Sequence, residues 1–153
     1  MLKVLKDLFD AVTGNDAAVA PRDDHALQLA AAVLLVEVMR ADPALGEKER
    51  AAVVEALRRS FTLADDEIDR LVDLAHERSR GAGDFFAFTS TLNDRYTHEQ
   101  KVRMVEQMWR VAFADGHLDA HENHLISKVA GLLHVTHGEY IAAKLHAKGA
   151  GHA

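Results

Sequence analysis

Cysteine is absent from this sequence, which excludes disulfide bonds and thiolate metal ligands. Proline occurs only twice, and no apolar run is long enough to cross a bilayer. The most apolar stretch, residues 29–36, is short and is followed by Glu37 and Arg40. The N-terminus does not resemble a signal peptide, because Asp7 and Asp10 interrupt its apolar residues. We therefore expect a cytoplasmic protein with at most peripheral membrane contact.

Basic residues are also fewer than acidic ones. The chain has 18 lysines and arginines against 24 aspartates and glutamates, a net charge of −6. An acidic protein is repelled by nucleic acid and by anionic membranes, so nucleic acid is not expected as a partner. Other proteins are the expected partners, and a homodimer stays open as an alternative to a monomer.

Apolar residues recur every three to four positions along the whole chain, and no stretch alternates as a strand would. This pattern predicts an all-α protein, a single compact bundle of seven to eight helices. Residues 1–22 are expected to form an amphipathic helix and a loop. The helical domain spans residues 23–147, with halves of about 23–80 and 84–147, and residues 148–153 form a flexible tail.

Two helices, residues 24–41 and 95–114, are apolar around most of their circumference, and such helices belong at the centre of a bundle. Glu37 interrupts the first of them and needs a partner if it is buried; Arg110 is the candidate. In the last helix, the spacing predicts that Tyr140, Ile141 and Leu145 face the core.

Helix starts are marked by capping patterns, in which a side chain before the helix and another three residues later satisfy the first amide groups. Thr97 with Gln100 and Thr136 with Glu139 each fit such a pair, and Thr62-x-x-Asp65 resembles a capping signal.

The stretch most informative about function is the turn Ala114-Asp115-Gly116-His117-Leu118-Asp119-Ala120-His121-Glu122. Gly116 can adopt positive φ and so end a helix, while Asp119 and Glu122 fit a capping box for the next helix. Capping does not explain Asp115, because negative charge is unfavourable at a helix C-terminus. A bound cation would make its position favourable.

Two sets of side chains in this turn could bind a metal. The oxygens of Asp115, Asp119 and Glu122 suit a hard cation such as Ca²⁺ or Mg²⁺. The imidazoles of three histidines would instead favour Zn²⁺, Ni²⁺ or Cu²⁺. Of the two sets, we expect the carboxylates with a hard cation rather than the histidines with Zn²⁺. The histidines are also explained without metal, as a solvated polar face. These alternative ligands are His117, His121 and His124. No catalytic motif is recognisable, so we do not expect an enzyme.

The first half of the chain echoes the second at a constant spacing. Ala41-Asp42 matches Ala114-Asp115, Glu49 matches Glu122 and Val53 falls opposite Ile126, after which the register slips by one residue. Such a repeat predicts two helix–turn–helix units related by a pseudo-two-fold axis.

The pattern Ala-Asp-Gly-x-Leu-Asp-x-x-Glu-x-x-x-Ile, followed by Ala-Gly-Leu-Leu-His-Val, resembles the signature of the TerB-like (tellurite-resistance B) domain family. The resemblance implies an all-helical bundle with internal pseudo-symmetry. It also implies acidic metal ligands, which are Asp115, Asp119 and Glu122 in one copy and Asp42 and Glu49 in the other. The first copy departs from the pattern at Pro43 and Gly46.

The resemblance further implies a non-catalytic, stress-associated binding module with a divalent cation at its acidic turn. A related domain occurs in some membrane-anchored J-proteins. The alternative is therefore a protein-interaction scaffold or co-chaperone-like module without metal.

Overall fold

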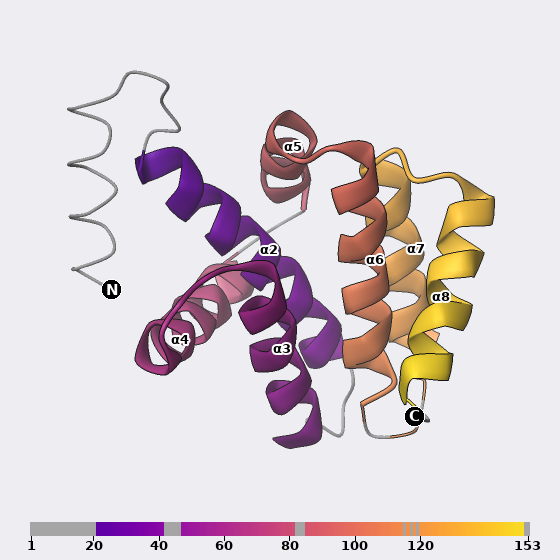
Figure 1. Ribbon diagram of the computed structural model, residues 1–153, viewed down its shortest axis with the longest axis horizontal. Coiled ribbons are helices and arrows are strands. Elements are labelled where there is room, and N and C mark those ends of the chain that lie inside the picture. The colour runs from indigo at the N-terminus through magenta and orange to yellow at the C-terminus, as the bar shows by residue number, and fades with distance from the viewer. Residues whose placement is uncertain are drawn as a thin grey trace.

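Seven α-helices make up the part of the chain that the structure describes, and no strand occurs in it (Figure 1). This computed structural model describes residues 21–41, 47–81, 85–114, 116, 118 and 120–151. The helices are α2 (Pro21–Ala41), α3 (Glu47–Ser60), α4 (Asp65–Gly81), α5 (Phe86–Arg95), α6 (His98–Ala112), α7 (Ala120–Leu132) and α8 (His137–Gly151). The all-α prediction is confirmed, and the amphipathic helix predicted near the N-terminus lies outside the described residues.

The helix boundaries follow local chemistry. α2 begins at Pro21, earlier than predicted, because proline suits the first turn of a helix, where its missing N–H is not needed. The capping boxes at Thr97 and Thr136 form as predicted: Gln100 and Glu139 accept from the backbone N–H of these threonines at 2.8 and 2.9 Å. The predicted signal at Thr62 is displaced.

At the start of α4, the residue that precedes the helix is Ala64, and its N–H donates to Oε1 of Glu67 at 2.8 Å. The third residue of the helix thus provides the cap that was expected from Thr62. α8 continues through Gly151, so it includes residues expected in the tail. The limits of the domain remain a prediction.

The centre of the bundle is formed by α2 and α6, as predicted. Every residue from Ala30 to Val36 is buried, and α2 packs against α3, α4, α5, α6 and α7. α6 contacts α2, α3, α7 and α8. Its buried side chains are Met104, Val105, Met108, Trp109, Val111 and Ala112. None of the helices within the described residues combines the length and the apolar character needed to cross a membrane.

The packing follows the predicted repeat. α2 packs on α4 as α6 packs on α8, and α2 meets α7 as α6 meets α3. Equivalent residues of the two halves are both buried at Val53 and Ile126, and still at Leu57 and Ala130, so the one-residue shift between the halves occurs later in the chain than predicted. The shift is present at the last helix of each half, because α8 begins one residue earlier than the position equivalent to the start of α4.

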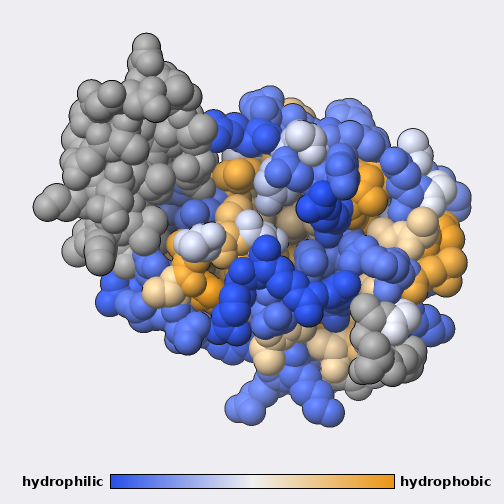
Figure 2. Space-filling model, viewed as in Figure 1, coloured by the Kyte–Doolittle hydropathy of each residue, from blue (hydrophilic) through white to orange (hydrophobic). Residues whose placement is uncertain are grey.

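The inward face of α8 was predicted correctly only at Tyr140, which is half-buried and packs against the core. Ile141 is 36% exposed and Leu145 is 63% exposed, whereas Ala143 and Ala147 are buried. Small side chains let α8 lie close against α6. Alanine therefore takes the inward positions that the periodicity predicted for isoleucine and leucine. Figure 2 shows a hydrophobic area at the right-hand edge, on the side where α8 lies in Figure 1.

The predicted partner of Glu37 was also wrong. Arg40, one turn further along α2, lies 3.1 Å from the Glu37 carboxylate and donates to Oγ of Ser79 in α4 at 2.6 Å. Arg110 instead pairs with Glu106 at 2.9 Å. Burial raises the pKa of Glu37, and Arg40 opposes that rise. Both charges are therefore compensated within their own helix.

Trp109 is the largest side chain in the core, and its ring is enclosed by aromatic and cationic neighbours. It stacks on Phe113 with centroids 5.7 Å apart, is tilted against Tyr140 at 5.3 Å, and lies 5.1 Å from Nζ of Lys144. We expect Trp109→Ala to lower the free energy of unfolding by about 3–5 kcal/mol, because it leaves a cavity where α6 meets α8. Urea denaturation measures this change.

The matched control is Phe86→Ala, since Phe86 is 67% exposed. Its change should stay within about 0.5 kcal/mol. Equal losses for the two variants would contradict the placement of Trp109 in the core.

Glu139 links α8 to α6 and gives the fold a defined pH dependence. Its carboxylate oxygens lie 2.8 and 2.9 Å from Nε2 of His98. The backbone N–H of Thr136, followed by the hydrogen bond to His98, lowers the pKa of Glu139 below its ordinary value of 4.5. A lowered pKa in the folded state means that ionised Glu139 stabilises the fold above about pH 4.5, and that this contribution is lost as the pH falls through the lowered pKa.

We therefore expect Glu139→Gln to be less stable than the wild type at pH 6, with the difference shrinking as the pH is lowered from about 4.5 to 3. Glutamine keeps the capping acceptor, as Gln100 does in the box at Thr97. Thermal melts of both proteins at each pH measure the difference. A difference that grows towards low pH would contradict this account.

Candidate metal centre

Two of the predicted metal ligands are completely buried. Glu49 in α3 and Glu122 in α7 both have 0% exposure, and they are the residues matched by the repeat. Each is the third residue of its helix. A carboxylate is favoured in the first turn of a helix by the amide dipoles, but burying its charge is costly unless other groups compensate it. The chain therefore has a completely buried carboxylate at two equivalent places.

The repeat brings these two positions to the same end of the bundle. α2 and α6 end at the lower side of Figure 1, and α3 and α7 begin there. In the second turn, Gly116 has the predicted positive φ, +79°, and its N–H donates to the carbonyl of Phe113 at 2.9 Å. The helix itself ends earlier than predicted, with Phe113 as its C-cap. Leu118 is half-buried and packs against the core, so it anchors the turn.

Four of the predicted ligands lie outside the described residues: Asp42, Asp115, Asp119 and His117. The alternative ligands His121 and His124 are exposed on α7. Among the residues that the structure describes, no three histidine, aspartate or glutamate side chains lie close enough to hold one metal ion. Both ligand sets, the carboxylates and the imidazoles, stay predictions.

Capping alone also explains a glutamate at the third helical position. Glu67, Gln100 and Glu139 occupy this position in α4, α6 and α8, and each accepts a hydrogen bond from the backbone N–H of the residue before its helix. Glu49 and Glu122 occupy the same third position in α3 and α7. They differ from Gln100 and Glu139 in being fully buried.

The oxygens of buried carboxylates suit a hard cation in chemical type, since Ca²⁺ and Mg²⁺ prefer oxygen ligands. Because both glutamates are fully buried, the more accessible ligands of such a site would have to come from other residues, which the prediction places in the turns.

Sequence reasoning missed a second feature of the surface. A cavity lies between the end of α3 and the face of α6 that carries Gln100, Arg103, Met104 and Gln107. The signal available in the sequence was the spacing of these four residues, which places them on one side of a helix. Nothing in the sequence indicated that Arg59 faces them.

The fold and the repeat define the class of protein: an all-helical bundle built from two helix–turn–helix units with acidic turns. A family model described as tellurite resistance protein TerB matches residues 28–145. The chain belongs to the TerB family. No curated protein and no solved structure matches the chain.

The buried glutamates give a stability prediction. Glu122→Ala should lower the free energy of unfolding by about 1–3 kcal/mol, because groups that the buried carboxylate satisfies lose their partner. Glu49→Ala should have a similar effect, since the repeat gives it an equivalent position. Urea denaturation is the measurement.

Glu47, the exposed first residue of α3, provides the control. Glu47→Ala should change stability by no more than about 0.5 kcal/mol. If Glu122→Ala proved as mild as this control, the buried glutamates would have no special structural role.

Proposed function

We propose that the protein is a non-catalytic, stress-associated binding module of the tellurite-resistance type, acting in the cytoplasm, whose acidic turn binds a divalent cation. Membership of the TerB family supports the general role. The observation that carries the cation proposal is the pair of fully buried glutamates, Glu49 and Glu122, at the start of repeat-related helices. The proposed cation is Ca²⁺ or Mg²⁺.

In this proposal, Asp115, Asp119 and Glu122 supply oxygen ligands in the second turn, and Asp42 and Glu49 supply them in the first. Water and backbone carbonyls complete the coordination, because three carboxylates fall short of the six to eight ligands that Ca²⁺ takes. The protein has a net charge of −6, so a bound cation also relieves repulsion among its carboxylates.

Thermal melts with chelator and with each cation test this proposal. A ligand at a hundred times its dissociation constant stabilises a fold by about 2.7 kcal/mol, which raises the melting temperature of a domain of this size by roughly 5–10 °C. We expect such a rise for the wild type in millimolar Ca²⁺ or Mg²⁺. Asp115→Asn should reduce the rise and leave the melt in chelator nearly unchanged.

A matched control is Asp94→Asn, which removes an exposed carboxylate at the end of α5, just before α6 and therefore at the end of α6 opposite to the second turn. It should keep the full response to cation. Capping without metal predicts a different pattern: Asp119→Ala would cost about 0.5–2 kcal/mol equally with chelator and with cation. A wild-type melting temperature that does not move in Ca²⁺, Mg²⁺ or Zn²⁺ would rule out the cation site.

One observation favours the second candidate, a protein-interaction scaffold or co-chaperone-like module without metal. Ile141 and Leu145 are exposed one turn apart on α8. Exposed apolar side chains on one helix face are typical of surfaces that bind other proteins. This candidate predicts no cation response, so the same melts separate the two.

A further inference from the structure

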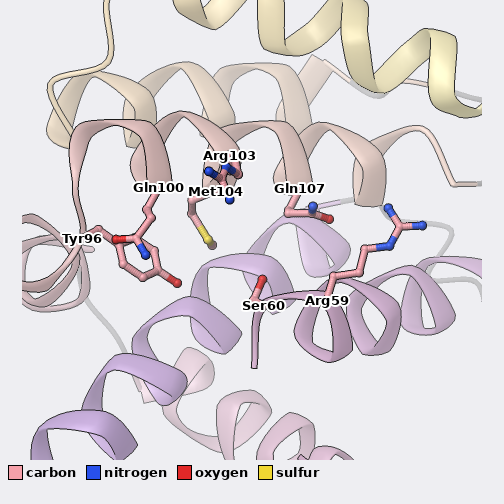
Figure 3. A pocket seen from close by; sticks show the side chains of 7 residues that line it. All are labelled: Arg59, Ser60, Tyr96, Gln100, Arg103, Met104 and Gln107. Carbon is pink, nitrogen blue, oxygen red and sulfur yellow. The ribbon is translucent and has the colours of Figure 1, made fainter. Parts of the chain in front are cut away.

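A cavity lies between α3 and α6, at the end of α3 opposite to the buried Glu49. It has a volume of about 310 Å³ and is lined by Arg59 and Ser60 at the end of α3, by Tyr96, and by one face of α6. Figure 3 shows Ser60 and Arg59 extending from α3 towards α6, with Tyr96, Gln100, Met104 and Gln107 on the opposite side. A volume of this size is at the small end of ligand-binding pockets, which range from about 300 to 1,000 Å³.

The charged residues that line this cavity are basic, although the protein as a whole is acidic. The lining includes two arginines and no aspartate or glutamate, although acidic residues outnumber basic ones in the chain. A cavity with positive charge on an acidic protein attracts anions locally while the rest of the surface repels them.

Two of the uncharged polar side chains, Gln100 and Tyr96, can donate hydrogen bonds to an anion. Oε1 of Gln100 is already engaged with the N–H of Thr97 at 2.8 Å, which leaves the amide N–H groups of this side chain to donate. Burial raises the pKa of Tyr96 to about 12, so its hydroxyl stays protonated and can donate. Ser60 donates to the carbonyl of Ala56 at 2.8 Å and therefore offers only an acceptor.

The floor of the cavity is apolar. Met104 is 4% exposed, and Figure 3 shows its sulfur directed into the space between the helices. The ring of Tyr96 adds a second apolar surface at one end. A ligand that fits this lining carries an anionic group for the arginines and an apolar body for the floor.

From these features we infer that the cavity between α3 and α6 binds a small organic anion, a phosphate ester or carboxylate with an apolar body. Arg103 binds the anionic group, Gln100 donates to it, Arg59 adds positive charge at the far end of the cavity, and Met104 contacts the apolar body. This site is separate from the proposed cation site and does not depend on it.

Both arginines have partners that a ligand must share or displace. Arg59 lies 3.2 Å from Glu55, and Arg103 lies 2.7 Å from Glu99. Both pairs are exposed, and exposed ion pairs are worth only about 0–1 kcal/mol, so they compete weakly with a bound anion. The carbonyl end of α3 also disfavours an anion beside Ser60. The anionic group is therefore expected on the α6 side, nearer Arg103.

The test uses phenyl phosphate as the probe and follows the backbone amide signals of the full chain by NMR. We expect saturable shifts of the amides from Tyr96 to Gln107. Arg103→Gln should weaken binding by about threefold to tenfold, since a charge-assisted hydrogen bond is lost. Glu99→Gln should strengthen it by about twofold, because it releases Arg103.

Arg78→Gln is the matched control, because Arg78 is exposed on α4 and does not line the cavity. It should change the affinity by less than about twofold. Arg103 is exposed, so its replacement does not threaten folding, and unchanged melts of each variant verify this.

Two comparison probes separate the parts of the ligand. Inorganic phosphate lacks the apolar body and benzyl alcohol lacks the charge, so both should bind more weakly than phenyl phosphate. The inference is overturned if phenyl phosphate leaves these amides unshifted, if either comparison probe binds equally well, or if Arg78→Gln weakens binding as much as Arg103→Gln.

Discussion

The rest of the structure depends on the burial of two central helices, α2 and α6. α2 is buried around most of its circumference, whereas α6 buries one broad face and exposes a polar face that carries Glu99 and Arg103, and each is covered by several other helices. Because the two have equivalent positions in the repeat, each supplies part of the cover that the other needs. α3 and α7 cross between the halves, and α4 and α8 close the outer sides. Half of the chain alone would leave one of these central helices uncovered.

The same repeat determines where the two acidic turns and the two buried glutamates lie. The ends of α2 and α6 and the starts of α3 and α7, which flank the two acidic turns, lie at one end of the bundle (Figure 1). A glutamate at the third position of the following helix is buried in both copies. The chain uses third-position acceptors as caps elsewhere, at Glu67, Gln100 and Glu139. A cation site in the turns would thus be an extension of ordinary helix capping, in which the same oxygens serve both purposes.

Much of the fold could be predicted from the sequence, because its signals are local. The 3.6-residue period and the threonine caps located the helices, and the all-round apolar pattern identified α2 and α6. Prediction failed where the outcome depended on contacts between distant elements. Ala143 and Ala147 displaced Ile141 and Leu145 from the inward face of α8, because close approach to α6 favoured small side chains. The partner of Glu37 was missed for a different reason: the prediction placed it across the core at Arg110, whereas Arg40, three residues along the same helix, is the partner.

The candidate site was less predictable than the fold. The capping pattern marked Glu122, but a residue that caps a helix is usually exposed, and its full burial follows only from the packing of α7. For the cavity between α3 and α6, the sequence shows only that its four α6 residues share one helix face, since Arg59 comes from the other half of the chain and is brought opposite them by packing.

Native-state hydrogen exchange tests most directly the central claim that the two halves share one core. The account predicts that amides of residues 30–38 in α2 and 104–112 in α6 are the slowest to exchange, and that both groups open with the same free energy, equal to that of global unfolding. If one group exchanged freely while the other stayed protected, the halves would be separate folding units and the account would be wrong.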